Sequence, residues 1–243
     1  MDTKVLFSVT GIGQPHYDHK LEILQFNLNK LSQCGVSNYQ IIISFYDESP
    51  IPEWLQKIGN VTVIREHNHV GSFIQKHLIP SKLDFDYIFM ILDDVQLPEN
   101  IDLMKMIKTY DNTYITNDKK KTLLSGTLSD DSIISHQYMK TQHNIMKNEN
   151  VIYHLRKEVN CEYFFYLMNK RSWKRYYSII NSYPKYTERL WGVDLLLKKY
   201  KINAYLCDGI ICKHYYSHGA GQFADLCVQQ MKKLLKKSHP PHY

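Results

Sequence analysis

Hydrophobic residues follow two different periods near the start of the chain. Val5–Thr10 is a short, β-branched apolar run that ends in Gly11-Ile12-Gly13, which is typical of a buried strand entering a loop. The next hydrophobic residues recur at helical spacing and a glycine stop follows them: Leu21, Ile23, Leu24, Phe26, Leu28, Leu31 and then Gly35. The pattern therefore predicts a strand, a loop and a helix.

The same strand and helix unit recurs over roughly the first 110 residues. Further strands are predicted over Tyr39–Phe45, Val61–Arg65 and Tyr87–Leu92. The helices predicted to follow them open at Pro52, lie around Ser72–Leu78 and begin near Glu99. Alternation of this kind predicts an α/β fold with a mostly parallel, Rossmann-like sheet and helices on both faces.

The second half of the chain has a less regular pattern. Strands are predicted over Leu123–Gly126, Glu162–Met168 and Ile202–Leu206, and helices over Arg171–Ile180, Leu190–Tyr200 and Gln222–Lys237. Thr127–Asn150 is polar and has no period, so we expect a long loop with broken helix. Loops of that length in a compact domain are usually functional or mobile.

Composition narrows the class of protein. With 243 residues, 44% hydrophobic and 22% charged, the chain is in the globular range and long enough for one domain. The first residues, MDTKVLFSVTGIG, are not expected to form a secretory leader, and no apolar run reaches membrane-spanning length. The five cysteines form no CxxC pair, which argues against a disulfide framework or a structural zinc site. We expect a soluble chain in a reducing, cytoplasmic compartment.

The net charge of +6 gathers partly in two lysine clusters, Lys119–Lys121 and Lys232–Lys237. A solvated face explains both clusters. A basic surface could also bind nucleic acid, anionic lipid or a diphosphate, and net charge does not choose among these partners. Nucleic acid is not the partner that we expect.

Candidate binding residues stand directly after the predicted strands, because open α/β sheets bind ligands beyond the carboxyl ends of their strands. Small residues, an aromatic ring and carboxylates at these places suit a nucleotide diphosphate. The predicted nucleotide-binding residues are Thr10, Gly11, Gly13, Tyr46, Asp47, Asn68, Gly71 and Asp93. Neither GxxxxGK[ST] nor GxGxxG occurs in the chain.

An aspartate pair in the segment FMILDDVQLP, Phe89–Pro98, is the sharpest feature of the sequence. A hydrophobic strand that delivers Asp93 and Asp94 to its open end suits Mg²⁺ or Mn²⁺, which take oxygen ligands and share further positions with substrate phosphates. The alternative is that both acids cap the following helix or begin a turn.

The strand and helix start, the aspartate pair and a later WGxD box together resemble the GT-A glycosyltransferases. The resemblance covers about residues 5–220. The sequence LDDV, residues 92–95, is similar to that of the small GT-A domains of large DNA viruses such as the chloroviruses. It implies a metal held by a DxD-type motif, in which Asp94 takes the position of the metal ligand. Leu92 stands where the family usually has its first acid, and Asp93 is the residue available to replace it.

The WG box is the segment YTERLWGVDLLLKKY, Tyr186–Tyr200. In the GT-A resemblance it supplies the acceptor-side carboxylate, the general base that removes the proton of the attacking hydroxyl. Asp194 is the better match and Glu188 the reserve, while Trp191 and Gly192 would let an acceptor sugar stack. The alternative is that Trp191 is a core residue and both acids are helix-start residues.

A late histidine is the third element of the resemblance, since GT-A enzymes often add one to the metal. His214 has that place in the sequence and His218 is second. The alternative is that two of the 12 histidines lie by chance in a tyrosine-rich loop.

The resulting hypothesis is a single GT-A domain over residues 1–243. Residues 1–115 would bind the nucleotide sugar, 116–221 the acceptor, and 222–243 would form a basic helix and tail. The expected activity is Mn²⁺- or Mg²⁺-dependent transfer of a sugar from a UDP- or GDP-linked donor to a glycan or other hydroxyl acceptor.

Two rival functions stay open. The first is a nucleotidyltransferase, although VTGIGQPHYDHK lacks the usual Gly-rich signature bearing Lys or Arg. The second is a non-enzymatic, basic module that binds a polyanion.

Overall fold

The structure is a computed structural model. It describes residues 3–14, 16–46, 48–66, 79–116, 122–129, 131–132, 152–154, 165–181, 200 and 202–216. Strands from both predicted halves of the chain, 1–115 and 116–221, lie together in its sheet.

The first part of the chain forms the parallel half of the sheet. Its elements are β1 (Lys4–Ile12), α1 (Tyr17–Gln33), β2 (Asn38–Tyr46), α2 (Glu53–Gln56), β3 (Val61–Glu66), the 3-10 helix η1 (Pro80–Lys82) and β4 (Tyr87–Ile91). β1 lies between β2 and β4 and is parallel to both, and β3 extends the sheet beside β2. All four predicted strands of this part are confirmed, and the helix predicted over 72–78 falls outside the described residues.

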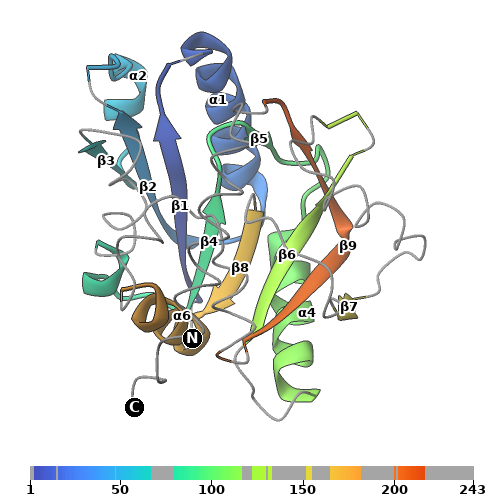
Figure 1. The fold of residues 1–243 in the computed structure, drawn as a ribbon. Helices are drawn as coiled ribbons and strands as arrows, with labels where there is room; N and C mark the ends of the chain where they lie inside the picture. The colour runs from blue at the N-terminus through green and yellow to red at the C-terminus, as the bar shows by residue number, and fades with distance from the viewer. Residues whose placement is uncertain are drawn as a thin grey trace, which may run out of the picture.

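The second part of the chain completes the sheet with strands of mixed direction. Its elements are β5 (Val95–Gln96), α4 (Leu103–Thr116), β6 (Thr122–Leu128), β7 (Ile152–His154), β8 (Phe165–Asn169), α6 (Lys170–Asn181) and β9 (Asn203–His214). The order is β3-β2-β1-β4-β8-β6-β9-β5, and β7 pairs with β9 (Figure 1). β8 is antiparallel to β4 and to β6, while β6 and β9 are parallel.

Several predicted boundaries in this part are wrong. β9 continues past Leu206 to His214, because β6 and β5 both offer backbone partners to its second half. The helix expected near Glu99 begins at Leu103, where the Asp102 side chain accepts a hydrogen bond from the Lys105 amide at 2.8 Å. β6 extends to Leu128, into the segment expected to be loop, and the short strand β5 was not predicted.

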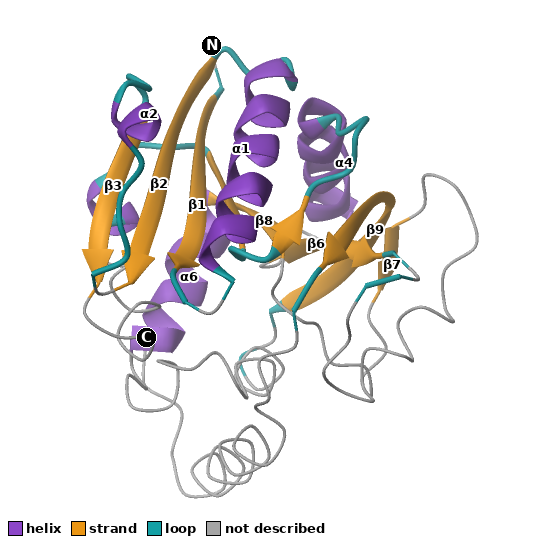
Figure 2. Cartoon of the chain, turned by 90° about the horizontal axis from the view of Figure 1, so that it is seen from above, coloured by secondary structure: helices purple, strands orange, loops and turns teal. Residues whose placement is uncertain are grey.

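Helices cover both faces of the sheet, as predicted. On one face α1 and α4 pack against residues such as Phe7 and Phe89. On the other face α6 brings Trp173 and Tyr176 against Ile88. Figure 2 shows the two helical layers with the strands between them. β1, β2 and β4 therefore bury both of their faces over most of their length, which explains their nearly continuous hydrophobic sequences. The edge strand β3 is only partly buried.

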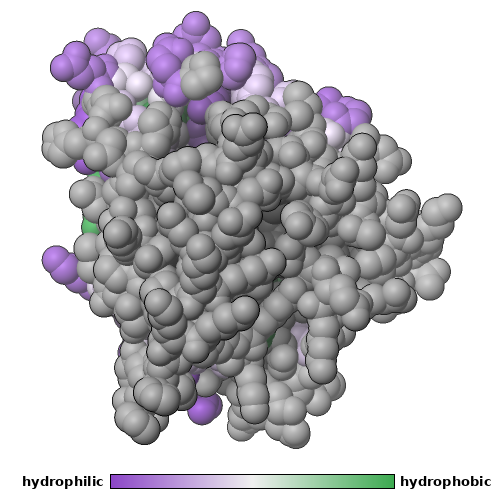
Figure 3. Space-filling view, viewed as in Figure 1, coloured by the Kyte–Doolittle hydropathy of each residue, from purple (hydrophilic) through white to green (hydrophobic). Residues whose placement is uncertain are grey.

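The described residues seen along one edge of the molecule are mostly hydrophilic (Figure 3). Figure 3 shows hydrophilic side chains along the edge where α1 and α2 lie. Among the described residues, the large hydrophobic side chain that is exposed is Ile211. Within the same part of the chain, no helix has the length and apolar character needed to cross a membrane.

Candidate functional site

The parallel register brings the predicted binding residues to one edge of the sheet. Val9 of β1 is paired with Ile91 of β4, so the loop after β1 and the aspartate pair after β4 start at the same level. β2 runs alongside and ends at Tyr46. The carboxyl edge of β1, β2 and β4 is therefore where a ligand of this fold would lie.

Tyr46 packs directly over the loop after β1. A Cβ atom added to Gly11 would overlap the phenol group of Tyr46, and one added to Gly13 would lie 2.9 Å from the Tyr46 Cβ. Gly11 also has φ of +47°, a backbone conformation that favours glycine, and its amide donates to the Ser44 hydroxyl at 2.8 Å. The two glycines are thus required by the close approach of an aromatic side chain, and no ligand is needed to explain them.

Gly11→Ala should be destabilising because the methyl group must displace Tyr46 and the backbone must keep a positive φ. We expect the free energy of unfolding to fall by about 1–3 kcal/mol, measured by urea denaturation. Gly59→Ala is the matched control, since a Cβ at that position meets no atom within 4 Å. Equal stability of the two variants would contradict this account of Gly11.

The structure brings Asp94 and His214 together, as the sequence predicts for a metal site. The Nε2 atom of His214 lies 3.3 Å from the Oδ2 atom of Asp94, and the two side chains are only 7% and 2% exposed. A carboxylate oxygen and an imidazole nitrogen are both ligands that Mn²⁺ accepts. No third His, Cys, Asp or Glu completes a metal-binding group with them in the described part of the chain.

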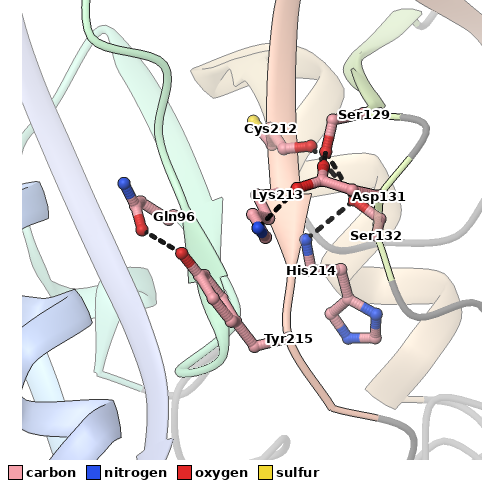
Figure 4. A network of polar contacts seen from close by, with 8 residues as sticks. All are labelled: Gln96, Ser129, Asp131, Ser132, Cys212, Lys213, His214 and Tyr215. Carbon is pink, nitrogen blue, oxygen red and sulfur yellow. Dashed lines mark hydrogen bonds and ion pairs between the residues drawn. The ribbon is translucent and has the colours of Figure 1, made fainter.

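Strand pairing holds His214 in this position. Val95 of β5 is paired with His214, and the amide of Tyr215 donates to the Asp94 carbonyl at 3.0 Å. On the side of β9 that pairs with β5, the Tyr215 hydroxyl donates to the Gln96 side chain at 2.6 Å (Figure 4). The backbone after the aspartate pair is therefore tied directly to the end of β9.

A turn after β6 holds the other side of β9. The Ser129 amide donates to the Cys212 carbonyl at 2.8 Å, and the His214 amide donates to the Ser132 hydroxyl at 3.0 Å. Figure 4 shows Ser129, Asp131 and Ser132 gathered against the strand. Lys213 hydrogen-bonds Asp131, which raises the pKa of the lysine and lowers that of the aspartate.

Asp93 takes a different partner from Asp94. Its Oδ2 atom lies 2.7 Å from the Nζ atom of Lys20, a lysine of α1 that is 1% exposed. The same Nζ atom donates to the Gly13 carbonyl at 3.2 Å. Lys20 therefore links the loop after β1 to the aspartate pair after β4.

A second polar residue of α1 fixes the segment that follows the aspartates. The buried Asn27 side chain donates to the Val95 carbonyl at 2.8 Å and accepts from the Leu97 amide at 2.9 Å. Sequence reasoning missed both Lys20 and Asn27. The available signal was that these two polar residues interrupt the hydrophobic stripe of α1, which also contains Ile23, Leu24, Leu28 and Leu31.

Aromatic and imidazole rings line the same region. Tyr216 stacks on His16 with 4.0 Å between ring centroids, and its hydroxyl hydrogen-bonds His19 Nδ1. His16 has a left-handed backbone, with φ of 69°. Burial, followed by the negative charge of Asp94, raises the pKa of Tyr216. These contacts bring the end of β9 against the start of α1.

The structure describes only part of the predicted site. It brings together Thr10, Gly11, Gly13, Tyr46, Asp93, Asp94 and His214 at the carboxyl edge of β1, β2 and β4. The remaining predicted residues lie outside the described residues: Asp47, Asn68, Gly71, Glu188, Trp191, Gly192, Asp194 and His218. Their roles stay predictions.

Comparison with known proteins shows the fold. No family model and no curated protein matches the sequence. An inositol-1-phosphate CTP transferase from T. maritima is similar in structure, with a TM-score of 0.54, 14% identity and 99% of each chain covered. The chain thus shares the fold of this protein, an α/β, Rossmann-like fold with a mostly parallel sheet and helices on both faces.

Two other structures overlap less closely, and both have a TM-score of 0.48. One is a candidate glucose-1-phosphate thymidylyltransferase from Bacillus anthracis, 14% identical over 99% of this chain and 98% of the other. The second is a 4-diphosphocytidyl-2C-methyl-D-erythritol synthase from Anaerococcus prevotii, which is 11% identical over 95% of this chain and 96% of the other. The similarity to viral domains stays a prediction.

Proposed function

We propose that this chain is a cation-dependent transferase that acts on a nucleotide-activated sugar or its precursors. The observation that carries the proposal is the buried pair of Asp94 and His214 at the carboxyl edge of the sheet. A buried carboxylate beside an imidazole suits Mn²⁺, and the nearby loop after β1 suits a nucleotide. A cation at this place would neutralise charge that develops on the phosphates of the leaving group.

Nucleotidyl transfer is the reaction that the fold comparison favours. The solved structure with a TM-score of 0.54 is named as a CTP transferase acting with inositol 1-phosphate. In such a reaction an oxygen of the sugar phosphate attacks the α-phosphorus of a nucleoside triphosphate, and pyrophosphate leaves. The buried Lys20 beside the loop after β1 fits this reaction, because it brings a positive charge close to where phosphates would bind.

Glycosyl transfer is the second candidate. The arrangement of Asp94 with a late histidine is the one that the resemblance to GT-A glycosyltransferases implies. In this reaction an acceptor hydroxyl attacks the anomeric carbon of a UDP- or GDP-linked sugar, and the nucleoside diphosphate leaves. Asp194 would take the proton of the hydroxyl, with Glu188 in reserve, and Trp191 and Gly192 would contact a glycan acceptor.

A product assay separates the two reactions. The chain with Mn²⁺ is given either nucleoside triphosphates with sugar 1-phosphates or nucleotide sugars with glycan acceptors. Release of pyrophosphate that requires the sugar phosphate supports nucleotidyl transfer, and release of UDP or GDP that requires the acceptor supports glycosyl transfer.

Nucleotide binding, measured by thermal shift, tests the proposal. No stabilisation of the chain by CTP, UDP or GDP in the presence of Mn²⁺, measured by thermal shift, would refute a nucleotide-dependent transferase. Salt-sensitive binding of single-stranded DNA in place of nucleotide would favour the basic binding module.

A further inference from the structure

Lys20 is a buried charged group of α1 that lies beside the aspartate pair. Its side chain is 1% exposed, and it stands in the first turns of α1 on the face that packs against the sheet. A buried lysine is costly unless it is paired and hydrogen-bonded, and Lys20 is both, through Asp93 and the Gly13 carbonyl.

The two aspartates therefore have different electrostatic surroundings although they are adjacent in sequence. Asp93 lies 2.7 Å from the Lys20 ammonium group, whereas Asp94 lies 3.3 Å from the His214 imidazole. An ammonium group carries only hydrogen-bond donors, so it competes with a cation for the carboxylate oxygen that it contacts. Asp94 instead lies beside the imidazole of His214, which can itself bind a cation.

We propose that Lys20 is a positioning residue that assigns separate tasks to the aspartate pair. It holds Asp93 against the loop after β1, on the nucleotide side of the site, and leaves Asp94 with His214 to bind the cation. This inference rests on the proposed function and deepens it. Of the two roles considered for Asp93 from sequence, it selects nucleotide binding over metal binding.

The charges predict how the cation affinity should change. With His214 neutral, one lysine and two aspartates carry one net negative charge. Removing the lysine makes the cluster more negative, and removing the Asp93 charge makes it neutral. A purely structural role of Lys20 would lower the cation affinity in every variant, whereas the electrostatic role predicts changes of opposite sign.

The experiment measures binding of Mn²⁺ alone by electron paramagnetic resonance titration, without nucleotide. Lys20→Met should bind Mn²⁺ about tenfold more tightly than the wild type, and Asp93→Asn about tenfold more weakly. The double variant should return to within about threefold of the wild type, because the net charge is restored. Lys30→Met is the matched control, since Lys30 lies in the same helix and pairs with the exposed Glu99.

Each outcome decides one point. Loss of Mn²⁺ binding in the double variant would make Asp93 a ligand and would overturn the proposed role of Lys20. Unchanged Mn²⁺ binding in Lys20→Met would also overturn the proposed role of Lys20. The double variant also keeps the test possible if Lys20→Met does not fold, because it leaves no buried charge without its partner. Absence of Mn²⁺ binding in the wild type would instead overturn the cation site itself, and with it the proposed function.

Discussion

Asp94→Asn should remove Mn²⁺-dependent binding of a nucleotide. We expect the affinity for Mn²⁺ to fall by more than about 100-fold, because losing an outer partner of a metal ligand already costs about 10- to 100-fold. The substitution keeps the size of the side chain, and the position lies just beyond the end of β4. Thermal unfolding followed by circular dichroism should therefore show a folded chain. Calorimetry with UDP, GDP or CTP, with and without Mn²⁺, measures the effect.

Glu99→Gln is the matched control for the loss of one carboxylate. Glu99 lies a few residues further along the chain, is 70% exposed at its side chain and pairs with Lys30 on the surface. Its substitution should leave Mn²⁺ binding unchanged, because an exposed ion pair contributes little to the stability of the fold and its loss should not disturb the site. If Asp94→Asn binds Mn²⁺ and nucleotide as the wild type does, the cation site is not at Asp94.

Asp194→Asn should lower the rate of glycosyl transfer by about 10² to 10⁴, the usual contribution of a positioned general base. An acceptor hydroxyl must lose its proton as its bond to the sugar forms, and the asparagine amide cannot take it. Donor affinity should stay nearly unchanged, since the base contacts the acceptor. Single-turnover rates and calorimetry with Mn²⁺ separate the two effects.

Glu188→Gln is the companion variant. Loss of transfer in Glu188→Gln alone would make Glu188 the base and shift the alignment of the WG box. Wild-type rates in both variants would eliminate this box as the source of the base. Absence of glycosyl transfer in the wild type, together with pyrophosphate release from a nucleoside triphosphate, would instead select nucleotidyl transfer, in which the sugar phosphate is already ionised and needs no base.

The hydrophobic pattern was sufficient to predict the parallel half of the fold. β1, β2 and β4 are nearly continuous apolar runs because helices cover both faces of the sheet, and this constraint acts on most residues of these strands. The edge strand β3 is only partly buried, and its sequence VTVIRE mixes apolar and polar residues. The edge at which Asp93 and Asp94 emerge follows from the same constraint, since parallel strands end on one side. The fold class and the edge of the sheet at which the two aspartates lie could therefore be predicted.

The second half was harder to predict because its strands depend on partners far along the chain. β5 is only two residues long and exists because the end of β9 pairs with it. β9 carries polar residues and Gly209, which weaken the local signal, yet its backbone finds partners in β6 and β5. The antiparallel direction of β8 is likewise set by its neighbours β4 and β6.

The sequence by itself determined the order of strands and helices in the parallel half and the edge of the sheet at which the aspartate pair emerges. Only the tertiary structure decided that Asp93 pairs with Lys20 and that Asn27 holds the backbone after the aspartate pair. The physical reason is that periodicity reports which face of an element is buried, whereas an ion pair depends on which elements pack together. Lys20 and Asn27 show this, because their place in a hydrophobic stripe marked them as buried without naming their partners.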